Sequence, residues 1–144
     1  LRDGRIMMWA RTDAGSQYLS WSADGGDTWT APVPSAIKSP RSPASIERLP
    51  GRDELMIVWN DHAKVAGEAR AWRTPLSVAV SRDDGKTWQA SRTLEDNPDG
   101  WYCYTAIEFV GDRVLLAHCA GIRQQGGLNV TQMTSFSVDW LLTD

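Results

Sequence analysis

The stretch SADGGDTW, residues 22–29, returns as SRDDGKTW at residues 81–88, 59 positions further along the chain. Both copies read S-x-D-x-G-x-T-W. An aspartate carboxylate can accept backbone N–H bonds within a turn, and glycine adopts a positive φ at little steric cost. The repeat therefore predicts one tight hairpin turn used twice, built by Ser22, Asp24, Gly26, Thr28 and Trp29 and again by Ser81, Asp83, Gly85, Thr87 and Trp88. We expect both tryptophans to be buried in the seam beneath the turn.

Short apolar segments separated by turn residues lie on either side of each repeated turn, and helical periodicity is almost lacking. They fall into three units, residues 1–38, 39–96 and 97–144, with the proline-rich segment SPRSP (39–43) between the first two. The third unit has no clean copy of the turn, since SFSVDW (135–140) is at best a degraded version. The expected strands are 5–11, 17–22 and 28–33; 44–49, 54–60, 76–81 and 87–94; and 102–110, 113–119 and 128–138, with 139–142 closing the third unit.

Units of 50 to 60 residues made only of antiparallel strands predict blades of a β-propeller. We therefore expect an all-β chain: one partial propeller domain, residues 1–144, of about three blades with about four strands each. The first unit lacks an opening strand, as expected for a piece cut from a longer protein. An ordinary β-sandwich is the alternative, but a sandwich does not require the same turn at the same place in each unit.

Composition narrows the classes of partner. The 144 residues carry a formal net charge of −3, whereas phosphate-reading domains are usually basic, so we expect no nucleic-acid partner. The charges are scattered and no apolar run approaches a membrane span, so no membrane partner is expected either. Cys103 and Cys119 make neither a disulfide scaffold nor a zinc pattern. They flank a Gly111-Asp112 turn, which leaves both a cross-strand disulfide and two free thiols open.

The repeated turns resemble the Asp boxes (BNR repeats) of sialidases, or neuraminidases, and of related six-bladed propellers. Two full copies at blade spacing carry this resemblance, which covers essentially the whole chain. It implies that the box lies at the outer rim of the propeller, far from the central pocket. Asp24 and Asp83 would then be structural rather than catalytic or calcium-binding. Asp boxes also occur outside sialidases, so they indicate the fold more firmly than the activity.

The resemblance also implies a site. Sialidases use three arginines that bind the sugar carboxylate, a Tyr nucleophile assisted by a Glu, and an Asp acid/base. LRDGRIMMWARTDAG (1–15) resembles the stretch that ends in the second arginine, which gives Arg11. RTPLSVAVSRDDGKTW (73–88) resembles the segment that begins with the third, which gives Arg73. WYCYTAIEF (101–109) resembles the strand of the nucleophile, which gives Tyr104, 31 positions beyond Arg73.

Each assignment has a plainer alternative. Arg11 could be a solvated arginine at the end of a strand, and Arg73 could cap the long loop. Tyr104 could be a core aromatic, and Tyr102 and Trp101 compete with it for the role of nucleophile. The Glu, the first arginine and the acid/base Asp have no counterpart in the chain, and Thr105-Ala106 departs from the more usual serine-containing sequence. The long loop 61–74 is a further functional candidate, because loops of this length in compact domains tend to be functional. Alternation and position suggest four neighbours of the site: Asn60, Asp61, Glu108 and His118.

The resemblance therefore implies a fragment of a retaining exo-sialidase that needs neither metal nor cofactor and binds a sialylated or other acidic glycan. The isolated chain is expected to be inactive. A non-catalytic carbohydrate-binding or scaffolding propeller is the alternative. The compartment is not fixed by the sequence, although the resemblance fits a secreted or periplasmic parent. Because three blades cannot close a ring, we expect two copies of the chain to associate as a homodimer.

Overall fold

The computed structural model describes residues 1–63, 65, 67 and 71–143. Its strands form three antiparallel sheets in which every hydrogen-bonded neighbour is also the neighbour in sequence. A 3₁₀ helix η2 (Arg123–Gln125) and a short α1 (Val138–Leu142) occur in the last third of the chain. The first sheet contains β1 (Ile6–Ala10), β2 (Ser16–Ser22) and β3 (Val33–Lys38), the second β4 (Ser45–Arg48), β5 (Leu55–Asn60), β6 (Leu76–Ser81) and β7 (Gln89–Glu95), and the third β8 (Gly100–Val110), β9 (Arg113–Ile122) and β10 (Thr131–Ser137).

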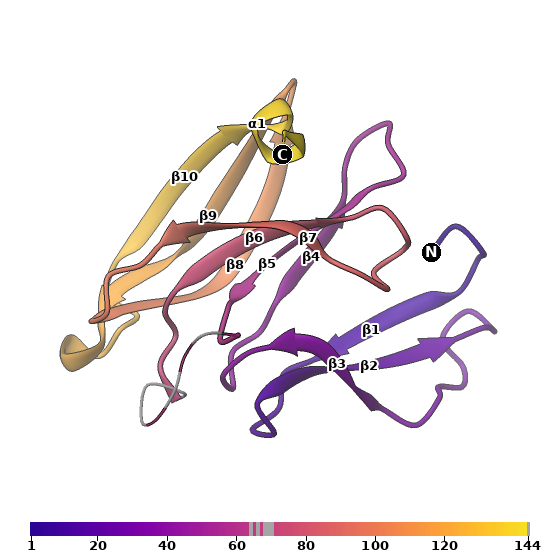
Figure 1. Cartoon of the computed structure of the whole chain (residues 1–144), viewed down its shortest axis with the longest axis horizontal. Helices are drawn as coiled ribbons and strands as arrows, with labels where there is room; N and C mark the ends of the chain where they lie inside the picture. The colour runs from indigo at the N-terminus through magenta and orange to yellow at the C-terminus, as the bar shows by residue number, and fades with distance from the viewer. Residues whose placement is uncertain (64, 66, 68–70, 144) are drawn as a thin grey trace.

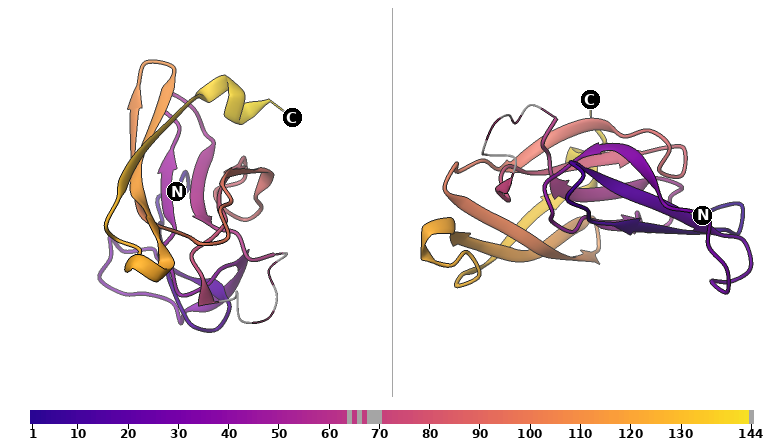
Figure 2. Two further views of the ribbon diagram at one scale, coloured as in Figure 1. Left: turned by 90° about the vertical axis from the view of Figure 1, so that its left-hand side faces the viewer. Right: turned by 90° about the horizontal axis from the view of Figure 1, so that it is seen from below.

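The sheets lie side by side in chain order, from β1–β3 in indigo and purple to β8–β10 in orange and yellow (Figure 1). The turned views of Figure 2 show the same succession, with the middle sheet between the other two. This is the arrangement of successive propeller blades, as the sequence predicted. No helix in the described residues is long and apolar enough to cross a membrane.

The middle sheet is covered on both faces, which explains why every residue of β5 and β6 is buried. Alternation along a strand sends successive side chains to opposite faces. Met56 and Val58 belong to a core shared with the third sheet, where Leu116 and Phe136 are among their neighbours. Ile57 and Trp59 belong to a second core that includes Ile37 of the first sheet. The near-continuous apolar runs of β5 and β6 are therefore typical of strands packed between two blades.

Both Asp boxes form the predicted turn between neighbouring strands, the first between β2 and β3 and the second between β6 and β7. In the second box Ser81 Oγ donates to Asp83 Oδ1 at 2.8 Å and accepts from the backbone N–H of Gly85 at 2.8 Å. Thr87 donates its backbone N–H to Asp83 Oδ1 at 2.8 Å and its hydroxyl to Oδ2 at 2.6 Å. The first box repeats each of these bonds with Ser22, Asp24, Gly26 and Thr28. Gly26 and Gly85 have positive φ, +106° and +82°.

The two box tryptophans differ from the prediction that both are buried. Trp29 is 41% exposed, because its indole N–H folds back onto the carbonyl oxygen of Gly26 in its own turn, at 2.9 Å. Trp88 is half-buried and packs edge-on against Trp9, with ring centroids 5.8 Å apart, in the seam between the first two blades. Of the two, Trp88 is the one that joins the core between the first two blades.

Two strand predictions were wrong. The segment expected as a strand at 28–33 has no regular secondary structure as far as residue 32, and β3 begins at Val33. The closing segment 139–142 is helical, not extended: Ser137 Oγ accepts the backbone N–H of Trp140 at 3.0 Å and caps α1. SFSVDW is thus the end of β10 and a capped helix rather than a third Asp-box turn, and the third sheet has three strands in the described residues.

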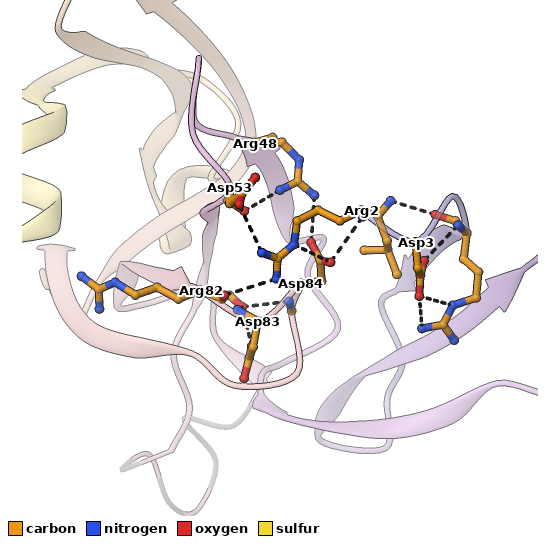
Figure 3. Close-up of polar contacts among 11 residues, drawn as sticks. Arg2, Asp3, Arg48, Asp53, Arg82, Asp83 and Asp84 are labelled. Atoms are coloured by element: carbon orange, nitrogen blue, oxygen red, sulfur yellow. Dashed lines mark hydrogen bonds and ion pairs between the residues drawn. The ribbon is translucent and has the colours of Figure 1, made fainter.

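An ion-pair cluster joins the segment before β1 to the middle blade (Figure 3). Arg2 Nε lies 3.0 Å from Asp84 Oδ2, and its Nη1 lies 3.2 Å from Asp53 Oδ2. Arg48 Nη2 reaches Asp84 Oδ1 at 3.0 Å. Burial raises the pKa of Asp84, but hydrogen bonds from Arg48 and Arg2 outweigh this effect and lower the pKa to about 2. The cluster lies at the Asp-box end of the sheets, so it braces the end opposite Arg73, which precedes β6.

Candidate functional site

Each of the three blades contributes one of the site residues predicted from sequence. Arg11 follows the last residue of β1, Arg73 lies three positions before the first residue of β6, and Tyr104 lies early in β8. The Arg73 guanidinium carbon lies 5.2 Å from the centroid of the Tyr104 ring. The Asp box of the middle blade starts at the other end of β6, about 20 Å away at the usual rise per strand residue. The structure thus brings the three residues together and keeps the boxes away from them.

Tyr104 lies in a β-bulge. The register of β8 on β9 shifts between Cys103 and Ala106, so that Tyr104 and Thr105 together face one residue, His118. Tyr104 has a φ of +55° and is 51% exposed. Bulky residues rarely adopt positive φ, and bulges are known to re-aim side chains next to active sites. The bulge is tied to the neighbouring blade by Ser45, whose hydroxyl donates to the carbonyl oxygen of Thr105 at 2.5 Å.

The two arginines determine the electrostatics of the phenol. Hydrogen bonding from Arg73, and then from Arg11, lowers the pKa of Tyr104 below its ordinary value near 10. Positive charge beside a phenol favours its anionic form. Tyr104 is therefore easier to deprotonate than a free tyrosine and lies next to two cationic forks suited to a carboxylate.

Arg73 is fixed from several sides. Its backbone carbonyl oxygen accepts the N–H of Tyr102 at 2.9 Å, and its Nη2 donates to the carbonyl oxygen of Arg41 at 3.4 Å. The guanidinium carbon also lies 5.1 Å from the centroid of the Trp101 ring, a cation–π contact. Trp101 in turn packs closely against the backbone of Gly127, where an added Cβ would meet the indole at 2.5 Å. This stack of contacts holds Arg73 at the edge of β8.

A cavity of about 640 Å³ opens beside Arg73, within the size range of small-ligand sites. Trp101 and Arg41 line it, and sequence reasoning had assigned neither of them to the site. Trp101 was considered only as a competitor for the nucleophile, and Arg41 lies in the proline-rich break, where no pattern pointed to a role. The other lining residues are Asp13, Ala14, Gly15, Ser39, Pro40 and Ala71.

Asn60 is the last residue of β5 and Asp61 follows it, and neither forms a hydrogen bond or an ion pair with Tyr104 in the described residues. Asn60 is buried, and its Nδ2 donates to the carbonyl oxygen of Pro75 at 3.3 Å. Asp61 accepts the backbone N–H of Ala63 at 3.0 Å and the hydroxyl of Ser91, in β7, at 3.3 Å. Both carry out local roles. The other candidate here, the loop 61–74, lies partly outside the described residues at 64, 66 and 68–70.

Glu108 and His118 also have local explanations. Glu108 is exposed, but the bulge at Tyr104 and Thr105 interrupts the alternation that was expected to place Glu108 and Tyr104 on one face: Glu108 pairs with Leu115, on the face of Cys103 and Cys119. It also lies four residues beyond Tyr104, about 13 Å at the usual rise. His118 is 1% exposed. Its Nδ1 lies 3.0 Å from the carbonyl oxygen of Cys119 and its Nε2 3.0 Å from Thr134 Oγ1. His118 is a satisfied interior residue behind the bulge.

Three adjacent antiparallel blades with two Asp boxes define part of a sialidase-type β-propeller. The model of the BNR repeat-like domain family matches residues 1–116, and the chain belongs to this family. None of the curated proteins matches the sequence significantly.

Solved structures with the same fold include sialidases. The intramolecular trans-sialidase of Ruminococcus gnavus is 17% identical with a TM-score of 0.72; the match covers 100% of this chain and 32% of that protein. The NanB sialidase of Streptococcus pneumoniae is 20% identical with a TM-score of 0.74, over 98% of this chain and 23% of that one. The α-L-arabinofuranosidase Arb93A of Fusarium graminearum is 16% identical with a TM-score of 0.56, over 94% and 42%. The chain thus spans less than half of each structure, and at these identities the likeness shows the fold.

Proposed function

We propose that this chain is part of a retaining exo-glycosidase that hydrolyses terminal sialic acid from glycoconjugates. Tyr104 is the nucleophile, and Arg11 and Arg73 bind the carboxylate of the sugar. The observation that carries the proposal is the setting of Tyr104: an exposed phenol at φ +55° in a bulge, with its pKa lowered by hydrogen bonding from Arg73 and Arg11. Backbone conformations of this kind cost free energy and cluster at functional sites.

The chemistry follows from these groups. A guanidinium fork can bind a carboxylate through two parallel hydrogen bonds, which fixes the sugar in position and orientation. A neutral phenol approaches the anomeric carbon beside that carboxylate without the repulsion a second carboxylate would feel. Loss of its proton makes Tyr104 a stronger nucleophile. Its oxygen bonds to the anomeric carbon as the glycosidic bond breaks and the aglycone takes up a proton and leaves as an alcohol, and water then hydrolyses the covalent glycosyl intermediate. The acid/base Asp and the Glu of this mechanism have no counterpart in the 144 residues.

Carboxylate binding tests the proposal on the chain itself. We expect the chain to bind N-acetylneuraminic acid and to bind its methyl ester much more weakly, because the ester cannot receive two charge-assisted hydrogen bonds. Arg73→Met and Arg11→Met should each weaken binding of the acid without lowering the melting temperature. Arg52→Met, at the opposite end of the middle blade, is the matched control. Calorimetric titration that gives equal affinity for acid and ester would contradict the proposal.

The isolated chain should not turn over substrate, because removing members of a catalytic unit costs orders of magnitude in rate. A chromogenic sialoside incubated with the pure chain is expected to release no sialic acid above the buffer control. Release that disappears in Tyr104→Phe would contradict this expectation and would show that the 144-residue chain suffices for catalysis.

A non-catalytic carbohydrate-binding or scaffolding propeller is the second candidate. One observation favours it: in the described residues no carboxylate forms a hydrogen bond or an ion pair with Tyr104, Arg11 or Arg73. Folds of this kind host unrelated functions. Assays of the full-length parent against a sialoside and against other acidic glycosides separate the two candidates. Hydrolysis of the sialoside, lost in Tyr104→Phe, supports the enzyme; binding with no hydrolysis of any glycoside supports the binding module.

A further inference from the structure

The two cysteines lie directly opposite each other in the ladder of β8 and β9. Cys103 pairs with Cys119 in register, and both are free thiols. Residues directly opposite in an antiparallel pair place their side chains on the same face of the sheet. The two sulfur atoms therefore extend toward the same side, one residue before the bulge that carries Tyr104.

The hydrogen bonding of neighbouring residues identifies the type of this pair. Tyr102 donates its N–H to the carbonyl oxygen of Arg73 at 2.9 Å, and its partner Ala120 donates to Val130 at 3.0 Å, so these two residues do not bond to each other. Pairs alternate along an antiparallel ladder. Cys103 and Cys119 therefore form a hydrogen-bonded pair, with Cα atoms about 5.5 Å apart. This separation lies within the range of about 4.4–6.8 Å seen for disulfides.

We propose that Cys103 and Cys119 are a modification site that forms a reversible disulfide bond across β8 and β9, beside the Tyr104 bulge. The register places the two Cα atoms at a separation that disulfides tolerate. The inference does not depend on the proposed function, because it concerns the two thiols and the ladder that holds them.

The two thiols differ in access, which sets the order of the reaction. Cys119 is partly exposed, whereas Cys103 is 2% exposed and burial raises the pKa of its thiol. The Cys119 thiolate attacks one sulfur of a small disulfide RSSR and displaces RS⁻, which takes up the proton that Cys119 has lost and becomes the first RSH. Cys103 then loses its proton, attacks the Cys119 sulfur of the mixed disulfide, and displaces the second RSH. Two protein thiols are oxidised to one disulfide, and RSSR is reduced to two RSH.

The bond would restrain the bulge. Cys103 immediately precedes Tyr104, and Cys119 immediately follows His118, which faces the bulge from β9. A cross-link at this pair fixes both strands at the edge of the irregular segment. We therefore expect the oxidised chain to melt at a higher temperature and to show slower amide exchange at residues 104–105 than the reduced chain.

Oxidised glutathione is the probe. Wild-type chain treated with it should lose the mass of two hydrogen atoms and yield a linked peptide containing Cys103 and Cys119, both reversed by dithiothreitol. Cys103→Ser keeps the accessible thiol and should carry one glutathione adduct. Cys119→Ser keeps only the buried thiol and should remain unmodified while folded. These two conservative variants distinguish the expected order of reaction from random oxidation.

Three outcomes count against the inference. Glutathione adducts on wild-type chain without an internal link would overturn it, and so would a disulfide between two chains. Equal amide exchange at residues 104–105 in the oxidised and reduced chains would overturn the link to the bulge. Because mass and exchange are measured without substrate, these results stand apart from the sialic-acid binding experiment.

Discussion

The backbone φ of Tyr104 is +55°, and its phenol receives hydrogen bonds from Arg73 and Arg11. We expect its pKa to lie below the ordinary value near 10 and to rise in Arg73→Met, because the largest hydrogen-bonding and charge contribution comes from that guanidinium. Absorbance titration of tyrosinate, with Tyr104→Phe subtracted to isolate the signal, measures the shift. Arg52→Met should leave it unchanged. An unaltered Tyr104 titration in Arg73→Met would show that the two side chains do not interact.

We expect Trp101 to influence the pKa of Tyr104 through its contact with Arg73. The guanidinium carbon lies 5.1 Å from the Trp101 ring centroid, and a cation–π contact of this kind is worth about 0.5–1 kcal/mol at exposed sites. Trp101→Leu should therefore raise the pKa of Tyr104, though by less than Arg73→Met does. Trp101→Phe retains an aromatic face and should restore most of the lowered pKa. If Leu and Phe behave alike, Trp101 contributes packing only and does not position Arg73.

The sequence predicted the identity of these site residues only through a resemblance, and it could not predict their local geometry. The segment WYCYTAIEF has the aromatic-rich pattern of an ordinary strand. The bulge at Tyr104 depends on the register of β8 against β9, which is a property of two strands and not of one. Trp101 and Arg41 likewise belong to the site only because the blades pack side by side.

At the scale of elements, the Asp-box turn could be predicted because each fixed residue satisfies a neighbour within its own eight residues. The prediction that Trp29 is buried was wrong because its indole N–H also bonds to a partner inside the turn, the carbonyl oxygen of Gly26. Trp88, which packs against Trp9, should therefore matter more. We expect Trp88→Ala to lower the free energy of unfolding clearly more than Trp29→Ala, whose effect should be about 1 kcal/mol or less. Urea melts of both variants measure it, and equal losses would contradict the assignment.

Asp83 makes the stability of the turn depend on pH. Hydrogen bonds from Thr87 lower the pKa of Asp83 to about 2, below the value of about 3.9 expected in the unfolded chain. A carboxylate with a depressed folded pKa contributes stability that is present above about pH 4 and is lost as the pH falls toward about 2. Asp83→Ala should thus be less stable than wild type at neutral pH, and the difference should shrink across that window. Urea melts in a pH series measure this, and a difference that stays constant down to about pH 2 would rule the carboxylate out as its source. Any ligand binding by the folded variant should be unchanged.

For the whole molecule, the number and order of the blades followed from the spacing of the two boxes, while the packing between blades did not. The outer faces of the first and third sheets expose apolar side chains: Ile6 and Met8 on one, Val110 and Met133 on the other, with Met133 63% exposed. The middle sheet shows what such faces require, since both of its faces are buried against a neighbouring blade. Exposed apolar surface of this kind favours association.

Two copies related by a twofold axis would place the third blade of each beside the first blade of the other and complete a ring of six. Cyclic dimers are the commonest closed assembly, so we expect the 144-residue chain to be a homodimer with twice its mass of 16.0 kDa. Met133→Glu, which places a charge on an outer face, should shift the chain toward monomer, whereas Lys86→Glu on the exposed Asp-box turn should not. Light scattering over a range of concentrations measures the mass. A well-folded wild-type monomer at high concentration would refute the dimer, because it would show that the two outer faces are stable in water.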